Sequence, residues 1–280
     1  MRIHCWGSRG SVTVSGEKYK KYGGDTTCIE VESDNGDLII IDAGTGIRML
    51  GNKLVETKDQ RDINLLLTHA HWDHLSGFPF FKPIYMENNT IRIYGPQATR
   101  DSLKSIISKT MTYPYFPIEF ENVSADITFL EMDNSGLKIG PVSVETIPIS
   151  HPNQGCGYKL TEGDKKFVFL TDNEFTHAHA GGLKFDDYRE FSEGADLLVH
   201  DAEYTREEYA YTKGWGHSVY LDTLELAMKA NVKRLGLFHL NQDRSDEEAD
   251  KMLADCTRII SENGSNLDCF MVKTGMDLDL

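Results

Sequence analysis

The fold of this chain is decided by the stretch Thr68-His69-Ala70-His71-Trp72-Asp73-His74. It follows the apolar run 63–67, which is typical of a buried strand. Three imidazoles and a carboxylate are costly to bury unless something organises them, and a metal ion does this well. Imidazole nitrogen and carboxylate oxygen suit zinc, and also manganese or iron. The alternative is a surface loop that happens to be rich in histidine.

Side chains alternate along an extended loop. Alternation therefore predicts that His69, His71 and Asp73 lie on one side of this loop. Asp73 and His74 are adjacent and are expected to point apart, so that they can serve a second metal.

Four further motifs lie in order along the chain. They are Ile39–Gly46 with Asp42, Ser150–Leu160 with His151, Phe167–Glu174 with Asp172, and Leu235–Asp246 with His239. Together with the first stretch, they resemble the signature of the metallo-β-lactamase superfamily, and the resemblance covers nearly the whole chain. It implies an α/β fold, a four-layer αββα sandwich with metals at the edge of the sheets.

The resemblance also implies a ligand set for two divalent metals, zinc first, with manganese or iron as alternatives. The ligands would be His69, His71 and His151 for one metal, Asp73, His74 and His239 for the other, and Asp172 as a bridge. A hydroxide between metals ~3.5–4 Å apart would be the nucleophile, with Asp73 counted among the catalytic residues. Asp42 is expected to orient a ligand histidine from behind, or else to act as a turn or helix-capping residue.

Two motifs favour the phosphodiesterase branch of the superfamily. The β-lactam-hydrolysing branch mostly has cysteine where this chain has Asp172. The segments 200–204 (HDAEY) and 214–219 (GWGHSV) resemble motifs of ribonuclease Z and its small-substrate relatives. His217 is therefore a candidate general acid or phosphate ligand, and Asp201 its orienting partner.

Alternatives stay open for both residues. Val219 stands where ribonuclease Z usually has threonine, and His217 could simply precede a helix at 219–230. His200, next to Asp201, is equally polar.

Two other segments are candidates for substrate contacts. Arg9 lies in the Gly-rich turn 7–11 and could bind phosphate, although such a turn can equally be a plain hairpin. Tyr113, Tyr115 and Phe116 belong to an aromatic and proline-rich loop that could stack a nucleobase. The alternative is a loop packed on its own core or on a second subunit.

Composition limits the function further. A chain of 280 residues with 40% hydrophobic and 26% charged residues fits a single globular domain over residues 1–280. The net charge of -15 repels phosphate backbones, so long nucleic acids are unlikely partners, whereas a small anion is not excluded. The five cysteines are odd in number and form no CxxC pair, which favours a reducing cytoplasm. No apolar run reaches the ~18–20 residues of a membrane span, and we see no signal peptide.

Secondary structure follows from periodicity. Strands are expected near Val31 and at 38–42, 63–68, 91–94, 127–131, 142–147, 157–161, 167–171, 196–200 and 234–239. Helices are expected after residue 47, around 103–107, at 219–230, and from a capping box at Ser245–Glu248 to about Ile260.

These observations predict a cytoplasmic two-metal phosphodiesterase for small phosphodiesters, such as cyclic nucleotides or related cyclic phosphates. The alternatives are a ribonuclease Z-like RNA endonuclease, a thioester or lactone hydrolase, and a non-catalytic metal- or nucleotide-binding sensor. A homodimer is possible, because relatives of this branch are often dimers.

Overall fold

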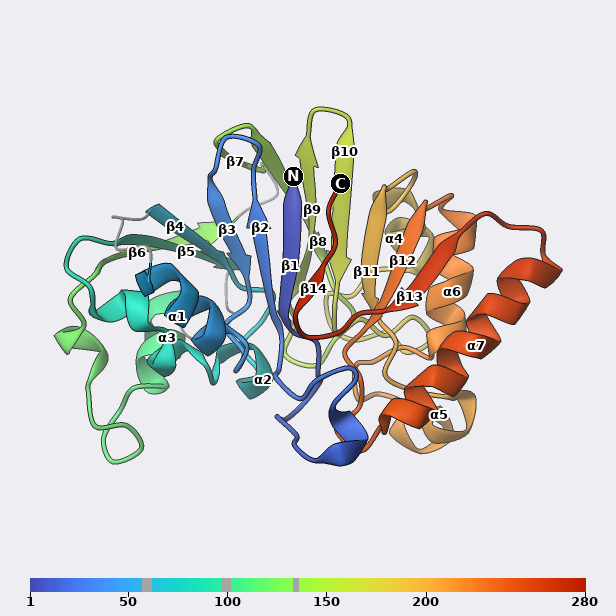
Figure 1. The fold of residues 1–280 in the computed structure, drawn as a ribbon, viewed down its shortest axis with the longest axis horizontal. Helices are drawn as coiled ribbons and strands as arrows, with labels where there is room; N and C mark the ends of the chain where they lie inside the picture. Colours follow the sequence, from blue (N-terminus) through green and yellow to red (C-terminus); the bar gives the residue numbers. More distant parts are fainter. Residues whose placement is uncertain (57–61, 97–101, 133–135) are drawn as a thin grey trace.

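The computed structural model describes residues 1–56, 62–96, 102–132 and 136–280. Within them, two seven-stranded sheets lie between two layers of helices (Figure 1). The first sheet has the order β14 (Met276–Asp277), β1 (Arg2–Gly7), β2 (Cys28–Glu32), β3 (Leu38–Ile41), β4 (Asp62–Leu66), β5 (Thr90–Pro96) and β6 (Asp126–Met132). The second has the order β13 (Asp268–Met271), β12 (Arg234–Phe238), β11 (Leu197–Asp201), β10 (Lys165–Leu170), β9 (Cys156–Glu162), β8 (Val142–Pro148) and β7 (Leu137–Ile139).

Helices flank the two sheets on their outer sides (Figure 1). Beside the first sheet lie α1 (Ile47–Glu56), α2 (Trp72–Leu75) and α3 (Leu103–Lys109). Beside the second lie α4 (Phe185–Phe191), α5 (Arg206–Thr212), α6 (Tyr220–Lys229) and α7 (Asp246–Glu262). Short 3-10 turns are η1 (Glu17–Tyr19), η2 (Phe78–Phe80), η3 (Lys82–Tyr85) and η4 (Phe120–Asn122).

The continuous apolar runs are explained by burial on both faces of each sheet. In β3, Ile39 and Ile41 belong to the core between the sheets. Leu38 and Ile40 alternate with them and pack in the core that includes Leu50 of α1. A strand covered on both faces loses the alternation of a half-exposed strand. The core between the sheets draws on both of them, and on this basis we propose that residues 1–280 form one domain.

Strand direction determines where the polar ends of the strands meet. In the first sheet β3, β4 and β5 are parallel, with Ile41 opposite Leu66 and Leu66 opposite Tyr94. In the second sheet β10, β11 and β12 are parallel, with Leu170 opposite His200. Carboxyl ends of parallel strands lie at one edge, so the segments that follow these strands are neighbours.

The αββα sandwich and the main predicted elements are confirmed. The predicted strands occur within one or two residues of their expected bounds. The Ser245 side chain accepts from the Glu248 N–H at the start of α7, as the capping box predicts. Residue periodicity missed the short elements β7, β13, β14, α2, α4 and α5. Of these, α5 has no buried residue. No helix in the described parts of the chain is long and apolar enough to cross a membrane.

Candidate metal centre

The seven predicted ligands meet at the carboxyl ends of the central strands. The segment after β4 carries His69 and His71 and continues into α2 with Asp73 and His74. The other three follow strands of the second sheet: His151 after β8, Asp172 after β10 and His239 after β12. The structure therefore joins four separate segments at one site.

The prediction of an extended loop with Asp73 on the side of His69 and His71, and with His74 pointing away from it, is wrong. The short helix α2 places Asp73 and His74 in the same group of ligands.

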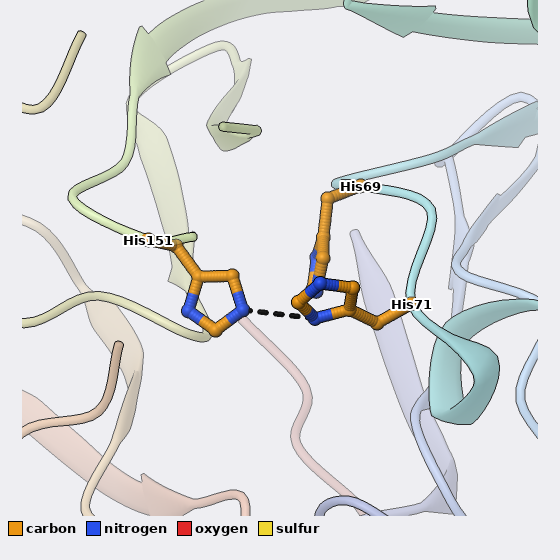
Figure 2. Close-up of side chains that lie close together, drawn as sticks. All are labelled: His69, His71 and His151. Atoms are coloured by element: carbon orange, nitrogen blue, oxygen red, sulfur yellow. Dashed lines mark hydrogen bonds between the residues drawn. The ribbon is translucent and has the colours of Figure 1, made fainter. Parts of the chain in front are cut away.

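Three histidines form the first group (Figure 2). Figure 2 shows His69 and His71 reaching from one loop toward His151, and His151 Nε2 lies 3.0 Å from His71 Nδ1. The ligand atoms of all three lie within 4.8 Å of one another. Burial lowers the pKa of each ring, to about 3 for His151, so all three are neutral at pH 7 and can offer a lone pair.

Two carboxylates and two imidazoles form the second group. His74 Nε2 lies 3.3 Å from Asp73 Oδ2 and 3.3 Å from Asp172 Oδ2. His239 Nε2 lies 3.1 Å from Asp73 Oδ2 and 3.3 Å from Asp172 Oδ1. Burial lowers the pKa of His74 and His239, but the adjacent carboxylates outweigh it and raise both well above the usual value. The carboxylates therefore stabilise positive charge at the second group.

Asp172 lies between the two groups. Its Oδ1 is 3.7 Å from His69 Nε2 and 3.8 Å from His151 Nε2, while it also faces His239. Its Oδ2 faces His74. One buried carboxylate therefore faces imidazoles of both groups, which is the position expected of a bridging ligand.

Unsatisfied nitrogen atoms show that the residues fit metal ions. His69 Nε2 and His74 Nε2 are buried and have no hydrogen-bond partner among the residues that the structure describes. Leaving such a group unpaired costs about 1–3 kcal/mol, and a metal in the site would satisfy both atoms. The donor set of imidazole nitrogen and carboxylate oxygen suits zinc, manganese or iron.

Backbone strain occurs at the same place. Asp42, Asp172 and His239 have positive φ angles of 63°, 53° and 59°. Residues other than glycine pay on the order of 1–3 kcal/mol for the left-handed region, and such strain clusters at functional sites. Each of these residues lies just after a strand, where a sharp turn directs its side chain into the cluster.

Asp42 supports His74 from behind, as the sequence suggests. Its Oδ2 accepts from His74 Nδ1 at 2.7 Å, and its two oxygens accept from the N–H and hydroxyl of Thr68, both at 2.8 Å. This hydrogen bond fixes the His74 tautomer and leaves Nε2 for a metal. Asp42 does not cap α1, which begins five residues later at Ile47.

We predict that Asp42→Asn weakens metal binding by about 10–100-fold, because removal of an outer carboxylate has this effect on ligated histidine. Competition with a chromophoric chelator measures the affinity. Asp164→Asn, which changes an exposed carboxylate, is the matched control. Equal affinities in Asp42→Asn and the wild type would contradict the prediction.

His217 lies against the cluster and is held by Asp201. Its Nδ1 is 2.8 Å from Asp201 Oδ2, and its ring stacks on His239 with 4.7 Å between centroids. Burial lowers the pKa of His217, yet Glu203 and Asp201 raise it to about 9, so the ring is protonated at pH 7. A helix does begin directly after this segment, as α6 at Tyr220, but no side chain that the structure describes caps it, and Ser218 donates to the Asn173 carbonyl instead.

His200 has a different environment from its neighbour. Its Nδ1 lies 2.7 Å from the Asp201 carbonyl oxygen, and its ring packs on Phe175 with 4.9 Å between centroids. Thr223 also approaches His200 Nδ1, at 3.3 Å. The structure thus separates the two residues: Asp201 faces His217, and His200 packs in the interior.

Two supporting contacts were missed by sequence reasoning. Glu203 Oε2 accepts from His239 Nδ1 at 2.9 Å and lies 3.4 Å from His217 Nδ1. The Ser11 N–H donates to Asp73 Oδ2 at 2.9 Å. Glu203 lies in the HDAEY segment and Ser11 in the Gly-rich turn 7–11. Neither motif indicated which ligand the residue would contact.

Arg9 has a structural role, contrary to its interpretation as a phosphate ligand. Its guanidinium donates to the carbonyl oxygens of Gly23, Asn241 and Arg244 at 2.9 to 3.2 Å. Arg9 is 1% exposed. The side chain therefore joins the N-terminal turn to the segment after β12.

The aromatic loop splits into two parts. Tyr113 and Tyr115 are 80% and 87% exposed. Phe116 instead packs on Phe80, with 5.6 Å between ring centroids, beside the core of the first sheet. Stacking of a base on the two tyrosines stays a prediction.

Comparison with known proteins identifies the family. The family "Beta-lactamase superfamily domain" matches residues 38–240. A ribonuclease Z of Haloarcula marismortui is 25% identical over 286 residues, covering 86% of each chain.

Two solved structures share the fold. The metallo-beta-lactamase fold protein YhfI of Bacillus subtilis is 18% identical, with a TM-score of 0.72, and the match covers 100% of this chain and 99% of that one. A diphosphatase of the PhnP family is 17% identical, with a TM-score of 0.70 over 100% and 97%. The family match spans most of the chain and includes all five motifs, from Asp42 to His239, so the chain belongs to the metallo-β-lactamase superfamily.

Proposed function

We propose that this hydrolase of the metallo-β-lactamase superfamily is a phosphodiesterase that cleaves small phosphodiesters, such as cyclic nucleotides or related cyclic phosphates. The observation that carries the proposal is the His217–Asp201 pair beside the two ligand groups. Hydrolysis of a phosphodiester needs a proton for the leaving oxygen, and a protonated imidazole at this position can donate one.

The residues divide the work between them. The two ligand groups would hold two divalent metals, which supply an activated water and spread charge over the phosphoryl oxygens when bound. Asp201 holds Nδ1 of His217, and this leaves Nε2–H free for the phosphate or the leaving oxygen. Glu203 and Asp201 together keep His217 cationic, so it attracts an anionic substrate before it gives up its proton.

The size of the substrate separates two candidate functions. The net charge of -15 favours a small phosphodiester over a long polyanion. The similarity to a protein named ribonuclease Z instead favours a long RNA substrate, and it supports an RNA endonuclease as the second candidate. The expectation that long nucleic acids are unlikely partners therefore needs a direct test.

Activity is expected to depend on the metal and to favour small substrates. The protein would be stripped of metal, refilled with Zn²⁺ or Mn²⁺, and assayed on bis-p-nitrophenyl phosphate, cyclic nucleotides and a precursor transfer RNA. We expect metal to restore hydrolysis of the first two, with little cleavage of the RNA. Efficient cleavage of RNA alone would instead assign the endonuclease. A fully metallated protein that cleaves only thioesters or lactones, or nothing, would contradict the proposal.

Metal identity and assembly are part of the proposal. We take zinc as the metal, with manganese or iron as alternatives, because the donor set accepts all three. The homodimer and the cytoplasmic location are retained as predictions from the sequence.

A further inference from the structure

Glu174 is a buried carboxylate that the proposed chemistry does not use. It follows Asp172 by two residues and is 1% exposed. Its Oε2 accepts from the Gly216 N–H at 2.8 Å and from His179 Nε2 at 2.7 Å. Its Oε1 accepts from the Gly214 N–H at 2.8 Å and from the Tyr209 hydroxyl. One carboxylate therefore binds two peptide N–H groups of the segment that carries His217.

Gly216 connects Glu174 to a predicted metal ligand. Its carbonyl oxygen accepts from His151 Nδ1 at 2.9 Å, while its N–H donates to Glu174. The residue has a φ of +96°, and a Cβ there would lie 2.0 Å from His151 Nδ1. The close approach requires glycine. This contact keeps the proton on Nδ1 and leaves Nε2 to face the metal position.

The backbone of Glu174 holds the other side of the same ligand. Its N–H donates to the carbonyl oxygen of Ser150 at 2.9 Å, directly before His151. The preceding Asn173 side chain accepts from the Ser150 N–H at 2.9 Å. The Ser218 hydroxyl donates to the Asn173 carbonyl at 2.5 Å, directly after His217. The segment after Asp172 therefore contacts Ser150, which precedes His151, and Ser218, which follows His217.

We infer that Glu174 is a positioning residue for the metal centre: it fixes the segment Gly214–His217 so that Gly216 orients His151 and His217 stays beside Asp201. The part that concerns His217 rests on the proposed phosphodiesterase function. The part that concerns His151 does not, because it predicts metal affinity alone.

The test compares full-length Glu174→Gln with the wild type. Glutamine keeps the size of the side chain but replaces one acceptor oxygen with a donor, so one glycine N–H loses its partner. We expect zinc affinity, measured by chelator competition, to fall by about tenfold, as for other outer partners of a ligated histidine. On bis-p-nitrophenyl phosphate, kcat should fall at saturating zinc while KM changes little.

Controls separate positioning from general stability. Glu207→Gln changes an exposed carboxylate on α5 and should match the wild type in zinc affinity and kcat. Glu174→Asp keeps the charge but is too short to reach both glycines. It should lose zinc affinity as well, and it decides the question if Glu174→Gln does not fold.

Two outcomes bear on different claims. If the wild type binds zinc but cleaves no phosphodiester, the proposed function fails, and the zinc affinities still test the role of Glu174. A folded Glu174→Gln protein with a lower Tm but unchanged zinc affinity and kcat would overturn the inference and make Glu174 a merely stabilising residue.

Discussion

His217→Ala is expected to lower kcat by about 10²–10⁴-fold, the contribution of a positioned general acid, with both metals retained. The leaving group shows how His217 acts. A p-nitrophenolate leaves without a proton, whereas the alkoxide of a cyclic nucleotide needs one. If His217 protonates the leaving oxygen, the loss will be much larger for the cyclic nucleotide than for bis-p-nitrophenyl phosphate. Equal losses on both substrates would instead mean that it only binds the phosphate.

The control for this experiment is His177→Ala. His177 lies in the nearby segment after β10 but is exposed. It should keep wild-type kcat and metal content, which elemental analysis by mass spectrometry measures. If His217→Ala kept full activity on both substrates, His217 would have no part in the chemistry.

Asp172→Asn should reduce both metal content and activity. Its carboxylate faces His69 and His151 through Oδ1 and His74 through Oδ2. An amide offers one neutral oxygen, so it cannot bind two metals in the same way. We expect bound metal to fall from two ions per chain to one or none. We also expect kcat/KM to fall by more than the about 10–100-fold lost on removing an outer partner.

Metal content after gel filtration and initial rates at saturating zinc measure these effects. Asp186→Asn, at an exposed position in α4, is the matched control and should retain two ions. Two tightly bound ions in Asp172→Asn would show that Asp172 does not bridge the metals.

The ligand set could be predicted because its motifs resemble those of the metallo-β-lactamase superfamily in their order and context. His69, Asp172 and His239 also follow apolar runs within two residues, so the strand and its ligand can be recognised together. The partners of the ligands are different, because the Ser11–Asp73 bond spans 62 positions and Glu174–Gly216 spans 42. Only the tertiary fold brings such pairs together, because Ser11 and Asp73 follow different strands of the first sheet, and Glu174 and Gly216 follow β10 and α5.

Arg9 shows why a residue type alone can mislead. Its charge suggested phosphate, but the carbonyl oxygens of Asn241 and Arg244 lie 232 and 235 positions away in sequence. No local pattern reveals that three carbonyl oxygens will converge on one guanidinium. The same holds for β14, because a strand of two residues has no periodicity to detect.

The pairing of β1 with β14 has a consequence for how this protein is made. His4 stands opposite Asp277 in that ladder, so the first sheet joins residues 273 positions apart. During synthesis β1 to β6 emerge well before β14, the strand that covers the β1 edge. When distant segments pair, the chain loses loop-closure entropy before the favourable contacts of the pairing form. We expect the nascent chain to leave this edge open until β14 has been made, and chaperones to protect the edge until then.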